Sequence, residues 1–268
     1  MQRNQDQAFD RGEKPARNQA QQQARKQSQK PGSSKLRGLP KDNPEVKLSK
    51  TLSWILRHEA KSEGLVMRPD GYVKVDDLLS NARLQDLDLE KLKSMVEKDA
   101  KTRFNLTCET VDGTSTWLIR ANQGHTLKTV QVELTPIESV ADIPTRVAVH
   151  GTNLKAWESI SKQGLSKMKR NHIHLAQGVA GENVISGMRS SSQVLIFVDV
   201  QKALDAGVKF HLSANGVVLT EGDDRGFLLP EFFRRVENAK REALPGWEGP
   251  VESTNTNEPT IPISSAES

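Results

Sequence analysis

The chain has 268 residues, 38 Lys and Arg against 34 Asp and Glu, a formal net charge of +4 and one cysteine. This length allows one large domain or two small ones, and the lone Cys108 excludes an intramolecular disulfide and a thiolate zinc site. There is no apolar run near the roughly 18 residues of a membrane span and no signal-peptide core, so we expect a soluble, intracellular protein with no membrane partner. We expect Cys108 to be a buried thiol in a reducing compartment.

Charge is unevenly distributed along the chain. Residues 1–41 carry ten Lys and Arg against three Asp and Glu, and the residues after 244 carry four Glu with no Lys or Arg. The segment 1–42 is rich in Gln, Asn, Lys and Arg and has few large apolar side chains, so we predict that it is disordered, as is the tail 244–268. A basic arm indicates a polyanionic partner that is attracted in a salt-sensitive way.

The first predicted helix lies within residues 48–60 and has two distinct sides. At 100° per residue its apolar stripe consists of Leu48, Leu52, Ile55 and Leu56. The other side carries Trp54, Arg57, His58 and Lys61. Two interpretations remain open for this second side: a solvated face of an amphipathic helix, or a cationic receptor for a phosphate.

The next segments predict two more helices and a β-hairpin. A short strand is expected at 72–75, followed by a helix that begins at residue 76 and a second with helical spacing over 87–99. Two strands, 103–107 and 116–120, are joined by the turn pair Asp112-Gly113. Three helical segments followed by a hairpin are the order of a winged-helix module, which we expect over residues 43–135.

A second region is expected over residues 136–243. Residues 130–134 alternate just before it, and its own spacing predicts a linker at 136–144, a strand at 146–152 and a helix over 154–163 that Gly164 ends. Further strands are expected at 172–175, 194–198, 208–213 and 216–220, and the fold should end near residue 236. The run 194–198 is fully apolar and should be central in a sheet. Because strands outnumber helices, we predict an α+β fold.

Several polar residues in these elements are candidates for chemistry. His150-Gly151-Thr152 ends a strand and His174 lies on another, so the two histidines either share a ligand cleft or form a hydrogen-bonded structural pair. Arg103 and Arg189 offer planar guanidinium groups suited to phosphate, although each taken singly is more typical of a protein surface than of a site. No metal is expected, because no third or fourth ligand stands at a suitable spacing. A P-loop and a dinucleotide GxGxxG are also absent.

Taken in order, these residues resemble the tRNA 2′-phosphotransferase family, which removes a splice-junction 2′-phosphate with NAD⁺. The resemblance runs over roughly residues 44–238. Its blocks are Leu48-Ser49-Lys50, Leu56-Arg57-His58, Asp70-Gly71-Tyr72-Val73, Lys101-Thr102-Arg103-Phe104, His150-Gly151-Thr152, His172-Ile173-His174-Leu175, Gly187-Met188-Arg189, Asn215-Gly216-Val217 and Leu219-Thr220.

The resemblance implies a winged-helix RNA-binding lobe followed by an ADP-ribosyltransferase-like NAD lobe. It assigns the catalytic roles to Arg57, His58, Arg103 and Arg189. It assigns NAD binding to His150, Gly151, Thr152, His174, Leu175 and Asn215. NAD is consumed as a co-substrate without a metal, the RNA partner is a 2′-phosphorylated tRNA, and we expect a monomer in the nucleus or the cytoplasm.

The implied reaction has two steps. The RNA 2′-phosphate displaces nicotinamide, and the ribose 2″-hydroxyl then attacks that phosphate to release 2′-OH RNA and ADP-ribose 1″,2″-cyclic phosphate. A phosphate dianion needs no general base, and the NAD lobe contains no Gln-x-Glu-type motif. Two alternatives stay open: ADP-ribosylation of a terminal nucleic-acid phosphate, which stops after the first step, and a non-catalytic RNA-binding module.

Overall fold

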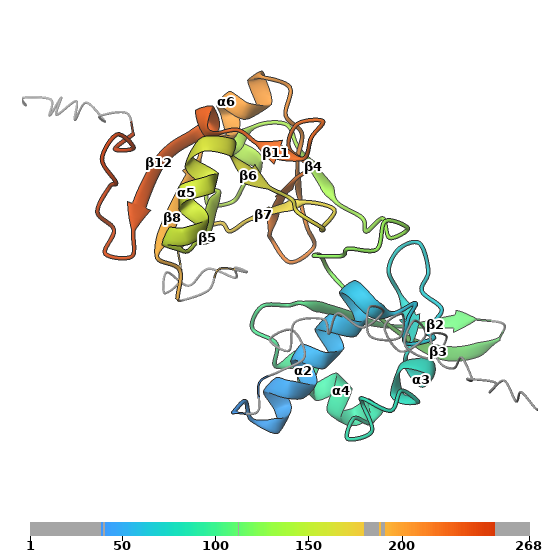
Figure 1. Cartoon of the computed structure of the whole chain (residues 1–268). Helices are drawn as coiled ribbons and strands as arrows, with labels where there is room; N and C mark the ends of the chain where they lie inside the picture. Colours follow the sequence, from blue (N-terminus) through green and yellow to red (C-terminus); the bar gives the residue numbers. More distant parts are fainter. Residues whose placement is uncertain (1–38, 40, 112, 180–187, 189–190, 250–268) are drawn as a thin grey trace, which may run out of the picture. The chain divides into compact units, whose positions relative to one another are not determined.

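The computed structural model describes residues 39, 41–111, 113–179, 188 and 191–249 (Figure 1). The chain divides into two units, with the boundary between Lys50 and Thr51 inside the first helix. In the first unit, the Asp42 carboxylate accepts hydrogen bonds from the Leu39 backbone at 2.7 Å and from Lys50 Nζ at 2.6 Å. The Asn43 side chain accepts from the Val46 backbone at 2.8 Å, which caps helix α2 (Pro44–Trp54).

The helix continues as a short π-helical segment, η1 (Ile55–Glu59), that contains Arg57 and His58. In the second unit Leu52, Ile55 and Leu56 are fully buried, which confirms their place on the apolar stripe. Trp54, expected on the cationic side, is only 7% exposed and lies under the Arg83 guanidinium at 5.6 Å. Burial of the indole removes a large apolar area from water, so the helix side that carries Trp54 is not solvated at this position.

A three-stranded antiparallel sheet follows, in the order β1-β3-β2, with α3 and α4 packed against β3 and β2 (Figure 1). Its elements are β1 (Val73–Lys74), α3 (Val75–Leu79), α4 (Leu89–Glu97), β2 (Phe104–Val111) and β3 (Thr114–Ala121). The Asp88 side chain caps α4 by accepting from the Lys91 backbone at 2.8 Å. The two helices and the hairpin are thus confirmed, although the hairpin strands are longer than predicted.

Cys108 is exposed, so the expectation of a buried thiol is wrong. Along the same face of β2, burial falls from Phe104, which is buried, to Leu106, which is half-buried, and to Cys108, which is exposed. The strand therefore leaves the core before it reaches its turn. An alternating strand pattern does not reveal where the covering layer ends.

The junction between the two predicted regions also differs from expectation. Residues 130–134 form no strand, whereas β4 (Thr135–Ile137) lies across the start of the predicted linker and pairs with β9 (Phe210–Leu212). The linker also holds a 3₁₀ turn, η2 (Val140–Asp142), which Ser139 and Asp142 close as a capping box. The pairing of β4 with β9, which is distant in sequence, outweighs the loop tendency of Pro136 and Pro144, the prolines at the two ends of the predicted linker.

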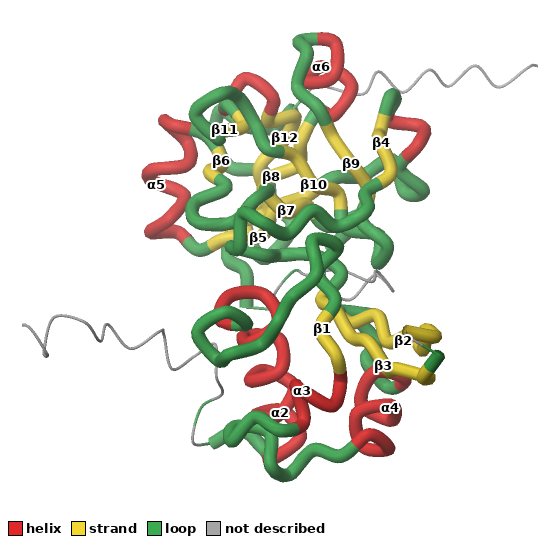
Figure 2. The backbone as a smooth tube through the Cα atoms, turned by 90° about the vertical axis from the view of Figure 1, so that its right-hand side faces the viewer, coloured by secondary structure: helices red, strands yellow, loops and turns green. Residues whose placement is uncertain are grey.

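The remaining strands form two larger antiparallel sheets and a small pair (Figure 2). The four-stranded sheet has the order β4-β9-β10-β7, with β10 (Val218–Thr220) and β7 (Ile173–Leu175). The three-stranded sheet has β8 (Val194–Val198) between β12 (Phe233–Asn238) and β5 (Val149–Thr152), which confirms the predicted central strand. The small pair is β6 (Leu165–Ser166) with β11 (Phe227–Leu228). The described helices here are α5 (Leu154–Gln163), α6 (Val200–Asp205) and the 3₁₀ turn η3 (Pro230–Phe232).

One apolar cluster fills the space among these elements. Helix α5 places Trp157 and Ile160 on it, and Gly164 ends the helix at φ +93° as expected. Leu244 and Trp247 pack on the same cluster, and the Trp157 and Trp247 rings meet edge to face at 5.4 Å. Residues 244–249 are therefore ordered, contrary to the predicted disorder of 244–268. The Trp247 indole buries apolar area, which the mostly polar composition of the tail did not indicate. The mixture of helices with antiparallel sheets confirms an α+β fold.

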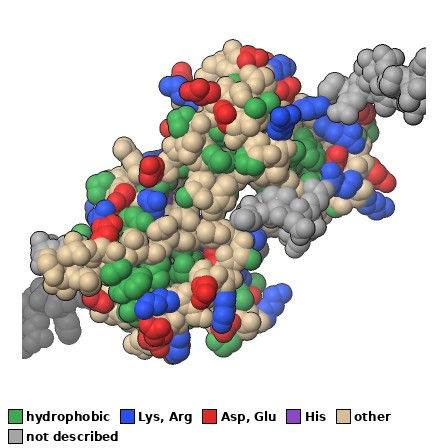
Figure 3. All heavy atoms as spheres, turned by 180° about the vertical axis from the view of Figure 1, so that it is seen from behind, with side chains coloured by type: hydrophobic (Ala, Val, Ile, Leu, Met, Phe, Trp, Pro, Cys, Tyr) green, Lys and Arg blue, Asp and Glu red, His purple; other side chains and the backbone are tan. Residues whose placement is uncertain are grey.

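On the face drawn in Figure 3, Lys and Arg side chains lie interspersed with Asp and Glu. The predicted arm and the end of the predicted tail, residues 1–38 and 250–268, lie outside the described residues. Among the helices that are described, none combines the length and apolarity that crossing a bilayer requires.

Candidate active site

Arg57 and His58 are fixed by hydrogen bonds to Thr126. The Arg57 carbonyl accepts from the Thr126 backbone at 3.0 Å and lies 3.4 Å from the Thr126 hydroxyl, which in turn lies 3.1 Å from His58 Nδ1. A carbonyl can only accept, so the hydroxyl donates to it and accepts from a protonated Nδ1. This arrangement leaves Nε2 of the neutral His58 ring as an acceptor.

The electrostatic surroundings keep His58 uncharged. Burial, then the charges of Arg170 and Arg57, lower the pKa of His58 to about 4. At neutral pH the ring is therefore a neutral imidazole, and an anion bound beside it would raise this pKa again.

Arg57 is the most unusual group of the site. Its Nε and Nη2 atoms are buried and have no hydrogen-bond partner in the described structure. Burial, followed by the charges of Arg170 and Arg103, lowers the pKa of Arg57 to about 10, so the guanidinium remains charged at neutral pH. The backbone of Gly124, at φ +89°, lies against its side chain, and a Cβ there would be 3.5 Å from Arg57 Cδ. Burying a cation with unsatisfied hydrogen-bond donors costs free energy, and a bound anion would offset that cost.

Arg103 reaches the same cluster from the turn that follows α4. Asp99 accepts a hydrogen bond from the Arg103 backbone at 2.6 Å and pairs with its guanidinium through the other carboxylate oxygen. Asn122 fastens the adjoining segment, with its backbone donating to the Arg103 carbonyl at 2.8 Å and its side chain to the Thr102 carbonyl at 2.7 Å. The backbone of Arg103 is thus fixed on both sides, while its side chain stays partly exposed.

The two predicted NAD-lobe histidines lie together. Nδ1 of His150 is 3.1 Å from the His174 carbonyl, which can only accept, so the proton of a neutral His150 is on Nδ1 and its Nε2 is an acceptor. Burial lowers the pKa of both rings. Nε2 of His174 is buried without a hydrogen-bond partner in the described structure, and the charge of Arg57 contributes to its lowered pKa. The two histidines are therefore linked by a hydrogen bond, and a shared ligand cleft stays a prediction.

The other predicted NAD residues contribute in different ways. A Cβ on Gly151 would lie 2.4 Å from Ser192 Oγ and 2.8 Å from Met188 Cγ. Only glycine at this position of β5 therefore leaves room for these two side chains. Thr152 accepts from the Gln193 backbone at 2.8 Å, which fixes the same approach. The Leu175 side chain is fully buried, which leaves its backbone for any contact with a ligand.

The Asn215 amide is engaged at both ends, because it donates to the Lys101 carbonyl at 3.1 Å and accepts from Ser213 Oγ at 2.9 Å. It therefore ties the turn after β9 to the segment that precedes Arg103. The predicted Arg189 lies outside the described residues.

Arg170 and His125 are the residues of this cluster that sequence reasoning missed. Arg170 is exposed, and its charge lowers the pKa of Arg57, His58, His150 and His174. His125 is only 3% exposed, its Nε2 has no hydrogen-bond partner in the described structure, and burial followed by the charge of Arg57 lowers its pKa to about 4. A signal was available for Arg170, since it lies two residues before the block 172–175.

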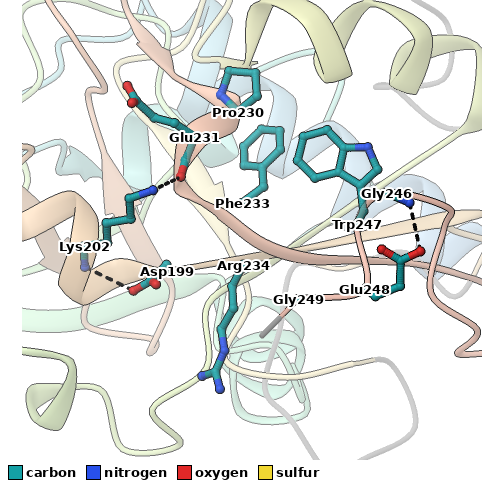
Figure 4. Close-up of a pocket in the computed structure, with 10 residues that line it drawn as sticks. All are labelled: Asp199, Lys202, Pro230, Glu231, Phe233, Arg234, Gly246, Trp247, Glu248 and Gly249. Atoms are coloured by element: carbon teal, nitrogen blue, oxygen red, sulfur yellow. Dashed lines mark hydrogen bonds between the residues drawn. The ribbon is translucent and has the colours of Figure 1, made fainter. Parts of the chain in front are cut away.

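A separate cavity of about 570 Å³ lies away from these residues, among the elements around β12 (Figure 4). It is lined on one side by Phe233 and Trp247 and on the other by Lys202, whose Nζ donates to the Glu231 carbonyl at 2.7 Å. None of the candidate residues lines it, so we place the chemistry at the cluster around Arg57. Within the described ranges, no group of three or more His, Cys, Asp and Glu side chains is placed to hold a metal ion.

The arrangement therefore combines fixed cations, neutral imidazoles with free acceptor nitrogens and no described metal-binding group. It suits a site that receives a phosphate group beside a ligand rich in hydroxyl groups. Residues 43–222 match the family model described as RNA 2′-phosphotransferase, Tpt1 / KptA family. The chain belongs to this family.

Its relatives carry the corresponding name. The chain is 43% identical over 200 residues to tRNA 2′-phosphotransferase 1 of Danio rerio, covering 74% of this chain and 88% of that protein. It is 44% identical over 193 residues to tRNA 2′-phosphotransferase 1 of Homo sapiens, covering 72% of this chain and 75% of that protein. A Schizosaccharomyces pombe relative is 47% identical over 203 residues, which cover 75% of this chain and about half (54%) of that protein.

Proposed function

We propose that this chain is an NAD-dependent tRNA 2′-phosphotransferase that acts in the last step of tRNA splicing. It transfers the internal 2′-phosphate at the junction of a ligated tRNA to NAD⁺ and yields 2′-OH RNA, ADP-ribose 1″,2″-cyclic phosphate and nicotinamide. The family match supports this function. The observation that carries it is the buried Arg57 guanidinium, in which Nε and Nη2 have no hydrogen-bond partner in the described structure. The charge of Arg103 lowers the pKa of Arg57, and the charge of Arg57 lowers the pKa of His58.

The proposed architecture is a winged-helix RNA lobe over residues 43–135 and an ADP-ribosyltransferase-like lobe over 136–243. The helices followed by the β1-β3-β2 sheet support the first lobe, and the two larger antiparallel sheets support the second. We further propose that the enzyme acts as a monomer in the nucleus or the cytoplasm, and that the basic arm increases its affinity for RNA through salt-sensitive attraction.

The residues present fit NAD⁺ at the histidine pair. Nε2 of His150 is an acceptor suited to a ribose hydroxyl, and the buried, partnerless Nε2 of His174 offers a second free ring nitrogen. Thr152, Gly151, Leu175 and Asn215 complete the proposed binding set from the family resemblance. When bound, NAD⁺ supplies a ribose carbon that a phosphate attacks as nicotinamide leaves.

Arg57, His58 and Arg103 hold the 2′-phosphate in this proposal, and Arg189 is assigned to the same phosphate from the resemblance. A phosphate dianion is already nucleophilic, so these residues need only bind and orient it during the first step. In the second step the phosphate would pass from the RNA 2′-oxygen to the ribose 2″-oxygen: the 2″-hydroxyl would release its proton to solvent as the bond from phosphorus to the RNA 2′-oxygen breaks, and the RNA 2′-oxygen would take up a proton. His58 can donate this proton once the bound dianion has raised its pKa.

The test is an assay with 2′-phosphorylated RNA, NAD⁺ and purified protein. We expect 2′-OH RNA and the cyclic ADP-ribose phosphate in equal amounts, and a loss of about 10²-fold or more in rate for Arg103→Ala, because a positioned cation contributes a few kcal/mol to the transition state. Lys61→Ala is the matched control, since Lys61 is exposed in the turn that follows the same helical segment.

Two outcomes would contradict the proposal. An ADP-ribosylated phosphate that accumulates without further change would indicate the one-step transferase. RNA binding without any product would indicate a non-catalytic module.

A further inference from the structure

The loop between β6 and β7 presents an exposed basic segment, residues 167–170. Met168 is 81% exposed and has φ +53°, a left-handed conformation that is unfavourable for a residue with a side chain. Lys169 and Arg170 are both exposed, and Lys167 is paired with Glu221 at 3.2 Å. The segment thus presents two basic side chains from a conformation that must be held by contacts elsewhere.

Those contacts attach the loop to the segment that fixes the Arg57–His58 pair. The Asn171 backbone donates to the His125 carbonyl at 3.1 Å, and its side chain donates to the Leu127 carbonyl at 3.3 Å. The Arg170 carbonyl lies 3.5 Å from Lys128 Nζ. Because Thr126, in the middle of this segment, binds Arg57 and His58, the backbone of Arg170 is held in a set position relative to both.

The charge of Arg170 acts on the same groups. After burial, it is the leading electrostatic cause of the lowered pKa of Arg57 and of His58. Two carboxylates oppose this effect, Asp99 at Arg57 and Glu59 at His58, and both rank below it. The free site therefore concentrates positive charge that a dianion would neutralise.

We propose that Arg170 is a further phosphate-binding residue of this site, at its exposed rim, and that it contacts the same 2′-phosphate that Arg57 and His58 receive from behind. The identity of the ligand rests on the proposed function. The guanidinium offers a planar pair of donors that matches phosphate oxygens, and its exposure lets it meet the RNA as the phosphate enters. The diphosphate of NAD⁺ shares this chemistry, so the test must separate the two sources.

The experiment measures binding of two labelled RNA oligonucleotides of one sequence, with and without an internal 2′-phosphate, by fluorescence anisotropy at fixed ionic strength. The variants are Arg170→Ala, Arg170→Lys and Arg170→Gln, and Lys169→Ala is the matched control on the same loop. Affinity for ADP-ribose is measured by calorimetry, and thermal unfolding shows that each variant is folded.

We expect Arg170→Ala and Arg170→Gln to reduce the preference for the phosphorylated oligonucleotide by about ten-fold or more, since a charge-assisted hydrogen bond is lost. Arg170→Lys should retain part of the preference as a point charge. Lys169→Ala should retain all of it, and the affinity for ADP-ribose should stay unchanged in every variant.

The inference is overturned if the preference persists in Arg170→Ala and Arg170→Gln, or falls equally in Lys169→Ala. It is also overturned if the wild type shows no preference, or if only the affinity for ADP-ribose falls. A wild type that prefers the phosphorylated oligonucleotide but never turns it over would contradict the proposed function and leave Arg170 as a phosphate ligand.

Discussion

Replacing Arg57 with methionine should make the ligand-free protein more stable while it abolishes activity. Methionine matches the unbranched part of the arginine side chain as far as Nε, which lies against Gly124, and removes the buried charge. A pKa lowered to about 10 means that the site disfavours the charged guanidinium by about 3 kcal/mol relative to water, at about 1.4 kcal/mol per pKa unit. Imperfect packing will offset part of this, so we expect a gain of about 1–3 kcal/mol in the free energy of unfolding.

The assay is urea and thermal unfolding in a buffer without phosphate or sulfate. A gain of this size corresponds to about 2–4 °C in Tm for each kcal/mol in a chain of this length. Lys61→Met provides the control for adding an apolar side chain to the same segment, and it should change the free energy of unfolding by no more than about 0.5 kcal/mol. Added inorganic phosphate should raise the Tm of the wild type and leave that of Arg57→Met unchanged, because only the wild type binds it.

A loss of stability greater than about 1 kcal/mol in Arg57→Met would refute this reasoning. It would mean that the guanidinium is satisfied in the folded protein and has a structural role. Equal stabilisation of both proteins by phosphate would place the anion site elsewhere.

Four further outcomes follow from the same geometry. Thr126→Val removes the oxygen that fixes the His58 ring, so kcat measured with 2′-phosphorylated RNA should fall about ten-fold while Tm changes little. Asp99→Asn cannot accept from Arg103 at both oxygens, and urea unfolding should show a loss of about 1–2 kcal/mol. Gly151→Ala places a Cβ 2.4 Å from a neighbouring hydroxyl oxygen, so a loss of about 1–3 kcal/mol is expected in the same measurement. The pKa of His58 is about 4 in the folded protein, against an ordinary value of 6.5 for the unfolded chain. Between pH 4 and 6.5 the unfolded chain therefore binds more protons than the folded protein. Stability should thus fall as the pH drops from about 6.5 towards 4, with a shallower slope in His58→Gln.

Local patterns in the sequence were enough to predict most of the secondary structure. Helical spacing and the turn pair at Gly113 indicated α4 and the β2–β3 hairpin, and an unbroken apolar run indicated the central strand β8. What failed depended on contacts between distant residues. Strand β4 exists because β9 pairs with it, and Trp247 is ordered because Trp157 lies across from it. Neither partner is visible in a local window.

For the site, too, the residues within motifs were predicted and the contacts between distant residues were not. The resemblance singled out Arg57, His58 and Arg103, and the structure brings these three together with His150 and His174 through shared electrostatic effects and hydrogen bonds. Angular position on a helix could not distinguish a solvated face from a ligand site, because the difference is whether other segments bury the charged groups. Thr126 and Asp99 come from other parts of the chain and have no motif of their own, so periodicity could not find them.

The electrostatics of the free site also explain how a phosphate could both bind and prepare the second step. In its absence the cations repel one another and the pKa of His58 is held near 4, so the ring carries no proton to donate. A bound dianion offsets the charge of Arg57 and of Arg170 together, which removes two of the causes that keep His58 neutral. The same binding event would therefore supply the nucleophile of the first step and the proton donor of the second. The first step at such a site needs no general base, because the phosphate dianion is already nucleophilic, and the charge of the same dianion sets the protonation state of the acid.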